Sequence, residues 1–348
     1  GMVVDKNGKK MSKTKGNGID PREMIAKYGT DPLRLSLVIG SSPGEKLRLY
    51  EEKIATYKNF VTKVWNSVRF ALMYTNSNET TIDNTKLNIQ DKWILSECQN
   101  LINSVTENLE SYRFSDAGNQ IYNFLRNKLC DWYLEMSKVE TNSAVVLHVI
   151  DACLKLLHPF TPMATTKLYS YINENELMLE SWPEVKTELI FEEAKEMEKL
   201  IQTVTAIRRI KKEFDLQTDK QVPIKLQTQQ KYIIESLEVI KKLSNSENIE
   251  LSNNSEKLKL PSEHLSFATD IYLKLENLNN IQEQVEKTEK QLNKIEKQLT
   301  NFTNKLSNKK FTDNAPGDII EKVETEKDKA QELLNNLIHK LNVLKECL

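Results

Sequence analysis

Residues 278–306 read LNNIQEQVEKTEKQLNKIEKQLTNFTNKL, and their apolar side chains recur alternately three and four positions apart. Such an a/d heptad is typical of a helix that buries one narrow stripe against a second helix. At about 1.5 Å per residue, this helix would be roughly 43 Å long. The repeat comprises Leu278, Ile281, Val285, Leu292, Ile295, Leu299, Phe302 and Leu306, with Thr288 in the remaining slot.

A second heptad follows a break at 307–317, where Pro316 and Gly317 are a turn signal. Two heptad helices joined by a short loop are expected to fold back as an antiparallel coiled coil, and a dimer of two chains is the alternative. We therefore predict that residues 276–348 form a helical arm. Its second stripe comprises Ile319, Val323, Ala330, Leu333 or Leu334, Leu337, Leu341, Leu344 and Leu348, with a slip in phase at Leu333-Leu334.

Upstream of the arm, residues 185–275 mix helical and strand patterns, which predicts a small α/β module. A basic helix over 200–214 carries adjacent cations that could contact RNA phosphates, although such a run is more often a solvated face. These cations are Arg208, Arg209, Lys211 and Lys212. The expected strands are 222–226, 249–251 and 271–273, and a further helix covers 233–243.

Residues 51–184 carry successive apolar stripes of helical period, which predicts a helical bundle. Most of its aromatic side chains are expected in the core, namely those of Trp65, Phe124, Trp132 and Phe160. By contrast, Arg69, Phe70 and Arg113 lie at stripe edges or in loops and are candidates for RNA contact. Asp131 and Glu135 lie one turn apart, and we expect salt bridges or caps rather than acid–base chemistry.

Residues 1–50 contain Lys10-Met11-Ser12-Lys13-Thr14, followed by Lys15-Gly16-Asn17. Two lysines that flank a serine next to a glycine suit a loop that brings ammonium groups to a polyphosphate. Gly16 allows a turn with positive φ, and the Asn17 side chain suits a turn or cap. Asp20-Pro21 predicts a helix start, whereas Asp31-Pro32 predicts an interruption.

With its context, this loop resembles the "KMSKS" element of class I aminoacyl-tRNA synthetases, in which the run Tyr28-Gly29-Thr30-Asp31-Pro32-Leu33-Arg34 also has a counterpart. Later segments resemble valyl-tRNA synthetases of the bacterial type, and the C-terminal helical arm is the best discriminator from isoleucyl enzymes. The matching segments include Asn59–Asn66, Cys130–Glu135, Leu157–Met163 and Ser181–Pro183.

The resemblance implies a fold that is mainly α: the end of a class I catalytic domain with its connector (1–50), an anticodon-binding helical bundle (51–184), a small α/β junction module (185–275) and a C-terminal antiparallel coiled-coil hairpin (276–348). It implies that Lys10 and Lys13 act in catalysis and that Lys13 and Ser12 contact the ATP phosphates. ATP is then a substrate, Mg²⁺ accompanies the nucleotide, and no protein metal site is expected. The implied function is the ATP-dependent attachment of valine to tRNA(Val).

The hairpin of valyl enzymes contacts tRNA, which makes Lys290, Lys294 and Lys297 candidates for phosphate contact. The alternative is that these lysines pair with glutamates on the same arm, such as Glu289 and Glu296. We expect a monomer that uses ATP and valine only together with a catalytic half upstream of Gly1, either removed or missing from the source gene. This chain alone is accordingly expected to be inactive in aminoacylation.

The composition fits a cytoplasmic protein. Lys and Arg number 49 against 50 Asp and Glu, and no apolar run approaches the ~20 residues of a membrane span. The four cysteines have no CxxC spacing, which argues against both zinc and a disulfide framework. Two other functions stay open on the sequence: a stand-alone tRNA- or RNA-binding module without catalysis, and a coiled-coil interaction protein.

Overall fold

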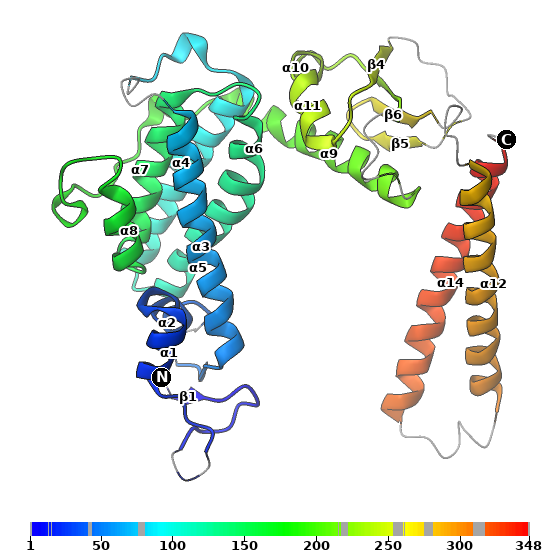
Figure 1. Cartoon of the computed structure of the whole chain (residues 1–348), viewed down its shortest axis with the longest axis horizontal. Helices are drawn as coiled ribbons and strands as arrows, with labels where there is room; N and C mark the ends of the chain where they lie inside the picture. Colours follow the sequence, from blue (N-terminus) through cyan, green and yellow to red (C-terminus); the bar gives the residue numbers. More distant parts are fainter. Residues whose placement is uncertain are drawn as a thin grey trace. The chain divides into compact units, whose positions relative to one another are not determined.

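The computed structural model describes residues 2–12, 14, 16–40, 44–75, 81–214, 216, 222–252, 260, 262–274, 281–308 and 317–346 (Figure 1). Its fold is mainly α, as predicted from the heptads and the helical stripes. The chain divides into two compact units, Gly1–Glu198 and Lys199–Leu348.

The first unit begins with a connector. Strands β1 (Val3–Val4) and β2 (Leu47–Arg48) pair in parallel, and helices α1 (Pro21–Tyr28) and α2 (Thr30–Val38) lie between them in sequence. The predicted helix start is confirmed, because the Asp20 side chain accepts a hydrogen bond from the Arg22 N–H and Pro21 is the first helical residue. The connector core consists of Met24, Leu33, Leu49 and Ile54.

The predicted interruption at Asp31-Pro32 is wrong. The chain breaks two residues earlier, at Gly29 with φ of 95°, and α2 starts at Thr30. Pro32 therefore lies in the first turn of a helix, where the missing N–H has no intrahelical partner to lose.

The bundle that follows is built from helices packed side by side (Figure 1). One helical run, α5–η3–α6, has a π-helical middle section, and it contains both Asp131 and Glu135. The helices are α3 (Glu51–Tyr74), α4 (Ile89–Glu110), α5 (Phe114–Asn123), η3 (Phe124–Tyr133), α6 (Leu134–Met136), α7 (Ser143–Leu157) and α8 (Pro162–Tyr169), and the short 3₁₀ turns are η2 (Asn84–Lys86), η4 (Leu177–Leu179), η5 (Thr187–Leu189) and η6 (Glu192–Lys195).

Side chains of the bundle largely follow the predicted pattern. Phe124 and Phe160 are buried, whereas Trp65 and Trp132 are only partly covered. The salt-bridge role expected for the two acidic residues of η3 and α6 is confirmed, since Asp131 pairs with Lys63 at 2.5 Å and Glu135 with Lys138 at 2.7 Å.

Connector and bundle are joined by polar contacts between segments far apart in the sequence. The buried Asp31 carboxylate accepts hydrogen bonds from the N–H groups of Met163 (3.3 Å) and Ala164 (2.7 Å) in the first turn of α8. Arg34 donates to the carbonyl oxygens of Pro159 and Phe160, at 2.9 and 3.2 Å. The connector that carries the lysine loop is thus fastened to the bundle.

The second unit contains helix α9 (Glu196–Glu213), whose first residues belong to the first unit, and a four-stranded sheet of order β4-β3-β6-β5. Strand β3 pairs in parallel with β4 and antiparallel with β6, which confirms an α/β module. Strand β5 was not predicted, and the helix expected over 233–243 is split at Ser236. The elements are β3 (Ile224–Thr228), α10 (Lys231–Glu235), α11 (Leu237–Ser244), β4 (Ile249–Ser252), β5 (Ser262–Leu265) and β6 (Thr269–Leu273).

Helices α12 (Ile281–Ser307) and α14 (Gly317–Glu346) pack along each other as an antiparallel hairpin within one chain (Figure 1). The heptad on α12 is confirmed, because its seven described stripe positions are buried or half-buried, from Val285 to Leu306. The slip in phase on α14 is resolved: Leu334 is 9% exposed and faces the partner helix, whereas Leu333 is 46% exposed. The ends of the two predicted stripes, Leu278 and Leu348, lie outside the described residues.

Within the described ranges, the structure contains no helix that is both long and apolar enough to cross a membrane.

Candidate functional site

The lysine loop, residues 10–17, is closed by one asparagine. Asn17 accepts a hydrogen bond from the Ser12 N–H (3.0 Å) through Oδ1, and its Nδ2 donates to the Asp5 carboxylate (2.8 Å) and to the Lys10 carbonyl (3.3 Å). The predicted turn role of Asn17 is confirmed, and Gly16 has the expected positive φ of 65°. The sequence analysis did not identify Asp5 as part of this site. Its partner Asn17 lies twelve positions further along the chain, and no local pattern links the two residues.

The three hydrogen bonds of the Asn17 side chain are called the Asn17 clasp here, and Asp5 is its acceptor on the connector side. Its carboxylate also accepts hydrogen bonds from the N–H groups of Asn7 and Lys9. These donations, with that of Asn17 the largest, lower the pKa of Asp5 below its ordinary value. The carboxylate is therefore held in its ionised form, as an acceptor for all three donors.

Some residues of the lysine motif pack against the connector, and others are exposed to solvent. Met11 is half-buried and packs against the connector core, which ties the loop down on its apolar side. Ser12 and Thr14 exchange a hydroxyl hydrogen bond at 3.1 Å, and both Lys10 and Thr14 are exposed. Lys13 lies outside the described residues, so its predicted role in catalysis and ATP contact stays a prediction.

Arg69 and Phe70 lie on α3, roughly 27 Å along the helix from its first residue at ~1.5 Å per residue. Arg69 is exposed, while the half-buried Phe70 ring packs against the Tyr74 ring at a tilt of 36°, with centroids 4.5 Å apart. The Lys138 ammonium lies 5.0 Å from the Phe70 centroid. An exposed cation, a pair of packed rings and a second cation near one of them form a surface suited to nucleobases.

Arg113 lies at the other end of the bundle, in the turn between α4 and α5. It is exposed between two exposed aromatic residues, Tyr112 (77%) and Phe114 (48%), whose rings meet edge to face. Tyr112 has φ of 58°, a left-handed conformation that is uncommon for a bulky residue. The structure therefore separates Arg113 from Arg69 and Phe70. The sequence contained a signal for its neighbours: two aromatic residues at a helix break.

Arg208 and Arg209, the candidates on the basic helix α9, are engaged within the second unit. Arg209 forms a bidentate ion pair with Glu263 of β5, and the Arg208 Nε donates to the Leu243 carbonyl at 2.8 Å. Their neighbour Lys211 is buried and donates to the Asn245 carbonyl at 2.7 Å. These contacts support the module, although Arg208 and Arg209 stay exposed beside Lys212 and only Lys211 of this run is buried.

On the hairpin, Lys290, Lys294 and Lys297 are all exposed on α12. Among the described side chains, none of these three forms an ion pair, so the same-arm pairing with described glutamates is not found. The ion pair seen on the described part of the hairpin joins the two arms instead, between Glu289 and Lys345 at 2.8 Å. The outer face of α12 therefore presents a row of cations.

Metal binding has no support from side-chain geometry in the described part of the chain. No group of three or more histidine, cysteine, aspartate and glutamate side chains converges there on a point that could hold an ion.

Comparison with known families covers three parts of the chain. A family described as "tRNA synthetases class I (I, L, M and V)" matches residues 1–50. "Anticodon-binding domain of tRNA ligase" matches residues 91–227, and "Valyl tRNA synthetase tRNA binding arm" matches residues 280–345. The three matches fall on the lysine loop with its connector, on the bundle with the start of the junction module, and on the hairpin.

Curated relatives extend the likeness over nearly the whole chain. Valine–tRNA ligase of Clostridium tetani is 37% identical over 99% of this chain, and that of Staphylococcus aureus is 36% identical over the same share. The chain spans 41% and 42% of the length of these two relatives. A solved LeuRS–tRNA–LeuAMS complex of Agrobacterium radiobacter has a partial likeness, with 23% identity and a TM-score of 0.48 over 55% of this chain and 24% of that one. The chain belongs to the valine–tRNA ligase family of class I aminoacyl-tRNA synthetases and corresponds to the C-terminal part of its longer members.

Proposed function

We propose that this chain binds tRNA(Val) and contributes a phosphate-binding loop to the ATP-dependent attachment of valine to that tRNA. One observation carries the proposal: a class I synthetase region, an anticodon-binding region and a tRNA-binding arm match one chain in that order. The chain is proposed to be cytoplasmic and monomeric, since its coiled coil closes within one chain.

The lysine loop would act on ATP by position and charge. Lys10 is exposed beside the Asn17 clasp, and Lys13 follows it in the motif. An ammonium group aimed at the phosphates stabilises the negative charge that develops as pyrophosphate leaves, without taking part in bond formation. Ser12 and Thr14 offer hydroxyl groups at the same place, and Mg²⁺ would arrive with the nucleotide.

Contact with tRNA is proposed at two separate places. The Arg69–Phe70–Tyr74 surface suits splayed bases, because an exposed ring offers stacking and an adjacent guanidinium offers hydrogen bonds. The cation row on α12 suits the phosphate backbone, which is bound by charge without reading sequence.

Filter binding of the whole chain to tRNA(Val) over a range of salt concentrations tests this proposal. Replacing Lys290, Lys294 and Lys297 together with glutamine should weaken binding at least tenfold and reduce the salt slope by about 2 to 3. The matched control replaces three exposed lysines of the first unit, Lys86, Lys186 and Lys195. We expect the control to bind within about twofold of the wild type.

Phe70→Ala should weaken the binding of tRNA(Val) without changing the salt slope, because it removes stacking rather than charge. Stacking of one base is worth about 1–3 kcal/mol, so the expected loss is about five- to 150-fold. Absence of salt-sensitive tRNA binding by the wild-type chain would refute the proposal and favour a coiled-coil interaction protein. Equal affinity for tRNA(Val) and unrelated RNA would favour an RNA-binding module of no specificity.

A further inference from the structure

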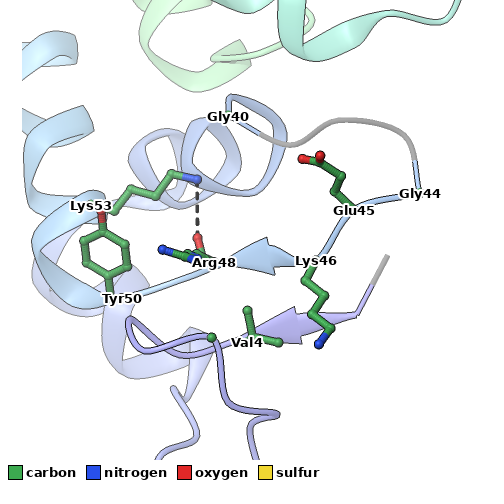
Figure 2. A pocket seen from close by; sticks show the side chains of 9 residues that line it. Val4, Gly40, Gly44, Glu45, Lys46, Arg48, Tyr50 and Lys53 are labelled. Carbon is green, nitrogen blue, oxygen red and sulfur yellow. Dashed lines mark hydrogen bonds between the residues drawn. The ribbon is translucent and has the colours of Figure 1, made fainter.

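Near the lysine loop, the connector borders an open hollow with a volume of about 740 Å³ (Figure 2). Strand β2, the first turn of α3 and the glycines Gly40 and Gly44 surround it, and Val4 and Gly8 close it on the side of β1. This volume is in the range of pockets that hold small ligands. The described lining is mainly polar, since Val4 is the one aliphatic side chain among the described residues that form it.

Charge on the lining is unbalanced. Lys46, Arg48 and Lys53 contribute three cations, and Glu45 contributes one carboxylate. The next two carboxylates along the chain do not neutralise them, because Glu51 pairs with Lys27 and Glu52 pairs with Lys6. The hollow is therefore electropositive, and it favours an anion.

Lys53 is the cation placed deepest. Its side chain is half-buried, and its Nζ donates to the Arg48 carbonyl at 3.4 Å. The ammonium also lies against Gly40, where an added Cβ would be 3.7 Å from Nζ. Burial lowers the pKa of Lys53, and among the described residues no carboxylate forms an ion pair with it. A half-buried ammonium without a counter-ion gains from an anion delivered by a ligand.

The other charged groups define which anion fits. Figure 2 shows Lys53 reaching from α3 toward the Arg48 carbonyl, while Lys46 and Arg48 extend from the β2 segment and Glu45 stands across the hollow. The half-buried Lys53 ammonium, with the exposed Lys46 and Arg48 elsewhere on the lining, favours a compact anion with several acceptor oxygens. Phosphate meets this description better than a carboxylate, because it presents more oxygens and more charge.

We propose that this hollow binds a phosphate group, separately from the lysine loop, and that Lys53 is its principal ligand. The phosphate would belong either to the backbone of RNA or to a free polyphosphate such as pyrophosphate. The RNA source rests on the proposed function, whereas the polyphosphate source does not. Glu45 opposes the anion and limits its affinity.

Isothermal titration of the whole chain with inorganic pyrophosphate, and separately with a short RNA duplex that lacks single-stranded bases, tests the proposal. Lys53→Gln should weaken the binding of at least one of the two probes about tenfold or more, because a charged hydrogen bond is lost. Lys53→Arg should retain most of the affinity. Glu45→Gln should strengthen binding about two- to fivefold, a gain that misfolding cannot produce.

The matched control is Lys58→Gln, which removes an exposed lysine from the same helix and does not line the hollow. Sensitivity to Lys53→Gln with pyrophosphate alone assigns a free polyphosphate, and sensitivity with the duplex assigns the RNA backbone. If Lys53→Gln matches Lys58→Gln with both probes, or if only Lys10→Gln abolishes pyrophosphate binding, the proposal is overturned.

Failure of this proposal can be told from failure of the proposed function. If the wild-type chain does not bind tRNA but binds pyrophosphate in a way that depends on Lys53, the proposed function is refuted and the phosphate site in the hollow is supported. If tRNA binding depends on the hairpin lysines and neither probe is sensitive to Lys53→Gln, the proposed function is supported and the phosphate site in the hollow is refuted.

Discussion

Replacement of Asp31 by alanine should destabilise the first unit, because this carboxylate caps a helix that is remote in sequence. Asp31 is 4% exposed and accepts from two N–H groups in the first turn of α8. Helix α8 has no cap of its own, since its N-cap residue, Thr161, makes no side-chain cap hydrogen bond. Asp31→Ala therefore leaves two N–H groups without their acceptor.

The magnitude follows from these contacts. Loss of a helix cap costs about 0.5–2 kcal/mol, and a buried hydrogen bond to a charged group contributes about 1.5–3 kcal/mol. Because the two contributions overlap, we expect the free energy of unfolding to fall by about 2–4 kcal/mol. That is a large part of the stability of a typical domain. Asp31→Asn keeps one acceptor oxygen and should cost about half as much.

Urea unfolding followed by tryptophan fluorescence measures this loss in the relevant unit alone. All four tryptophans, Trp65, Trp93, Trp132 and Trp182, belong to Gly1–Glu198. The control is Glu23→Ala, which removes an exposed carboxylate from the first turn of α1 and should change stability by less than about 0.5 kcal/mol. A loss below about 1 kcal/mol for Asp31→Ala would refute the cap and the fastening of connector to bundle.

Three further outcomes follow from other contacts. Leu334→Ala should destabilise the hairpin by about 2–5 kcal/mol, whereas Leu333→Ala should cost less than about 0.5 kcal/mol; hydrogen exchange of the α12 and α14 amides distinguishes the two. Burial raises the pKa of Asp91, so the native state binds its proton more tightly than the unfolded chain does; the contribution of Asp91 to the free energy of unfolding should fall as the pH rises from about 4, and tryptophan-monitored unfolding should show that the stability of the wild type relative to Asp91→Asn falls over this rise. Asn17→Ala should speed exchange of the Ser12 amide about fivefold or more and raise the pKa of Asp5 toward its ordinary value, both measurable by NMR.

The structure shows a difference between two groups of basic residues that the sequence analysis named as candidates for RNA contact. Arg208 and Arg209 are exposed, but their side chains also bind the Leu243 carbonyl and Glu263 within the second unit. Lys290, Lys294 and Lys297 are exposed, and none of them forms an ion pair among the described side chains. Both groups stay predictions as RNA ligands, and a ligand at α9 would compete with the contacts within the module.

Features that depend on neighbours within a turn or two could be predicted from the sequence. The Asp20 cap and the positive φ of Gly16 depend on neighbouring residues, and the apolar stripe of α12 is a periodic pattern within one helix. Local patterns of residue types of this kind were sufficient to predict a mainly α fold with a helical arm.

The sequence by itself thus determined the helices, the hairpin and the family of this chain, because periodicity, caps and motifs are local. Only the tertiary structure decided that Asp31 binds the first turn of α8, more than a hundred residues away. It also decided which of Leu333 and Leu334 is buried in the hairpin and that Lys53 lines an electropositive hollow. Each of these depends on which distant segment packs against the residue. No local pattern records that choice, since it is made by the burial and hydrogen bonding of the whole unit.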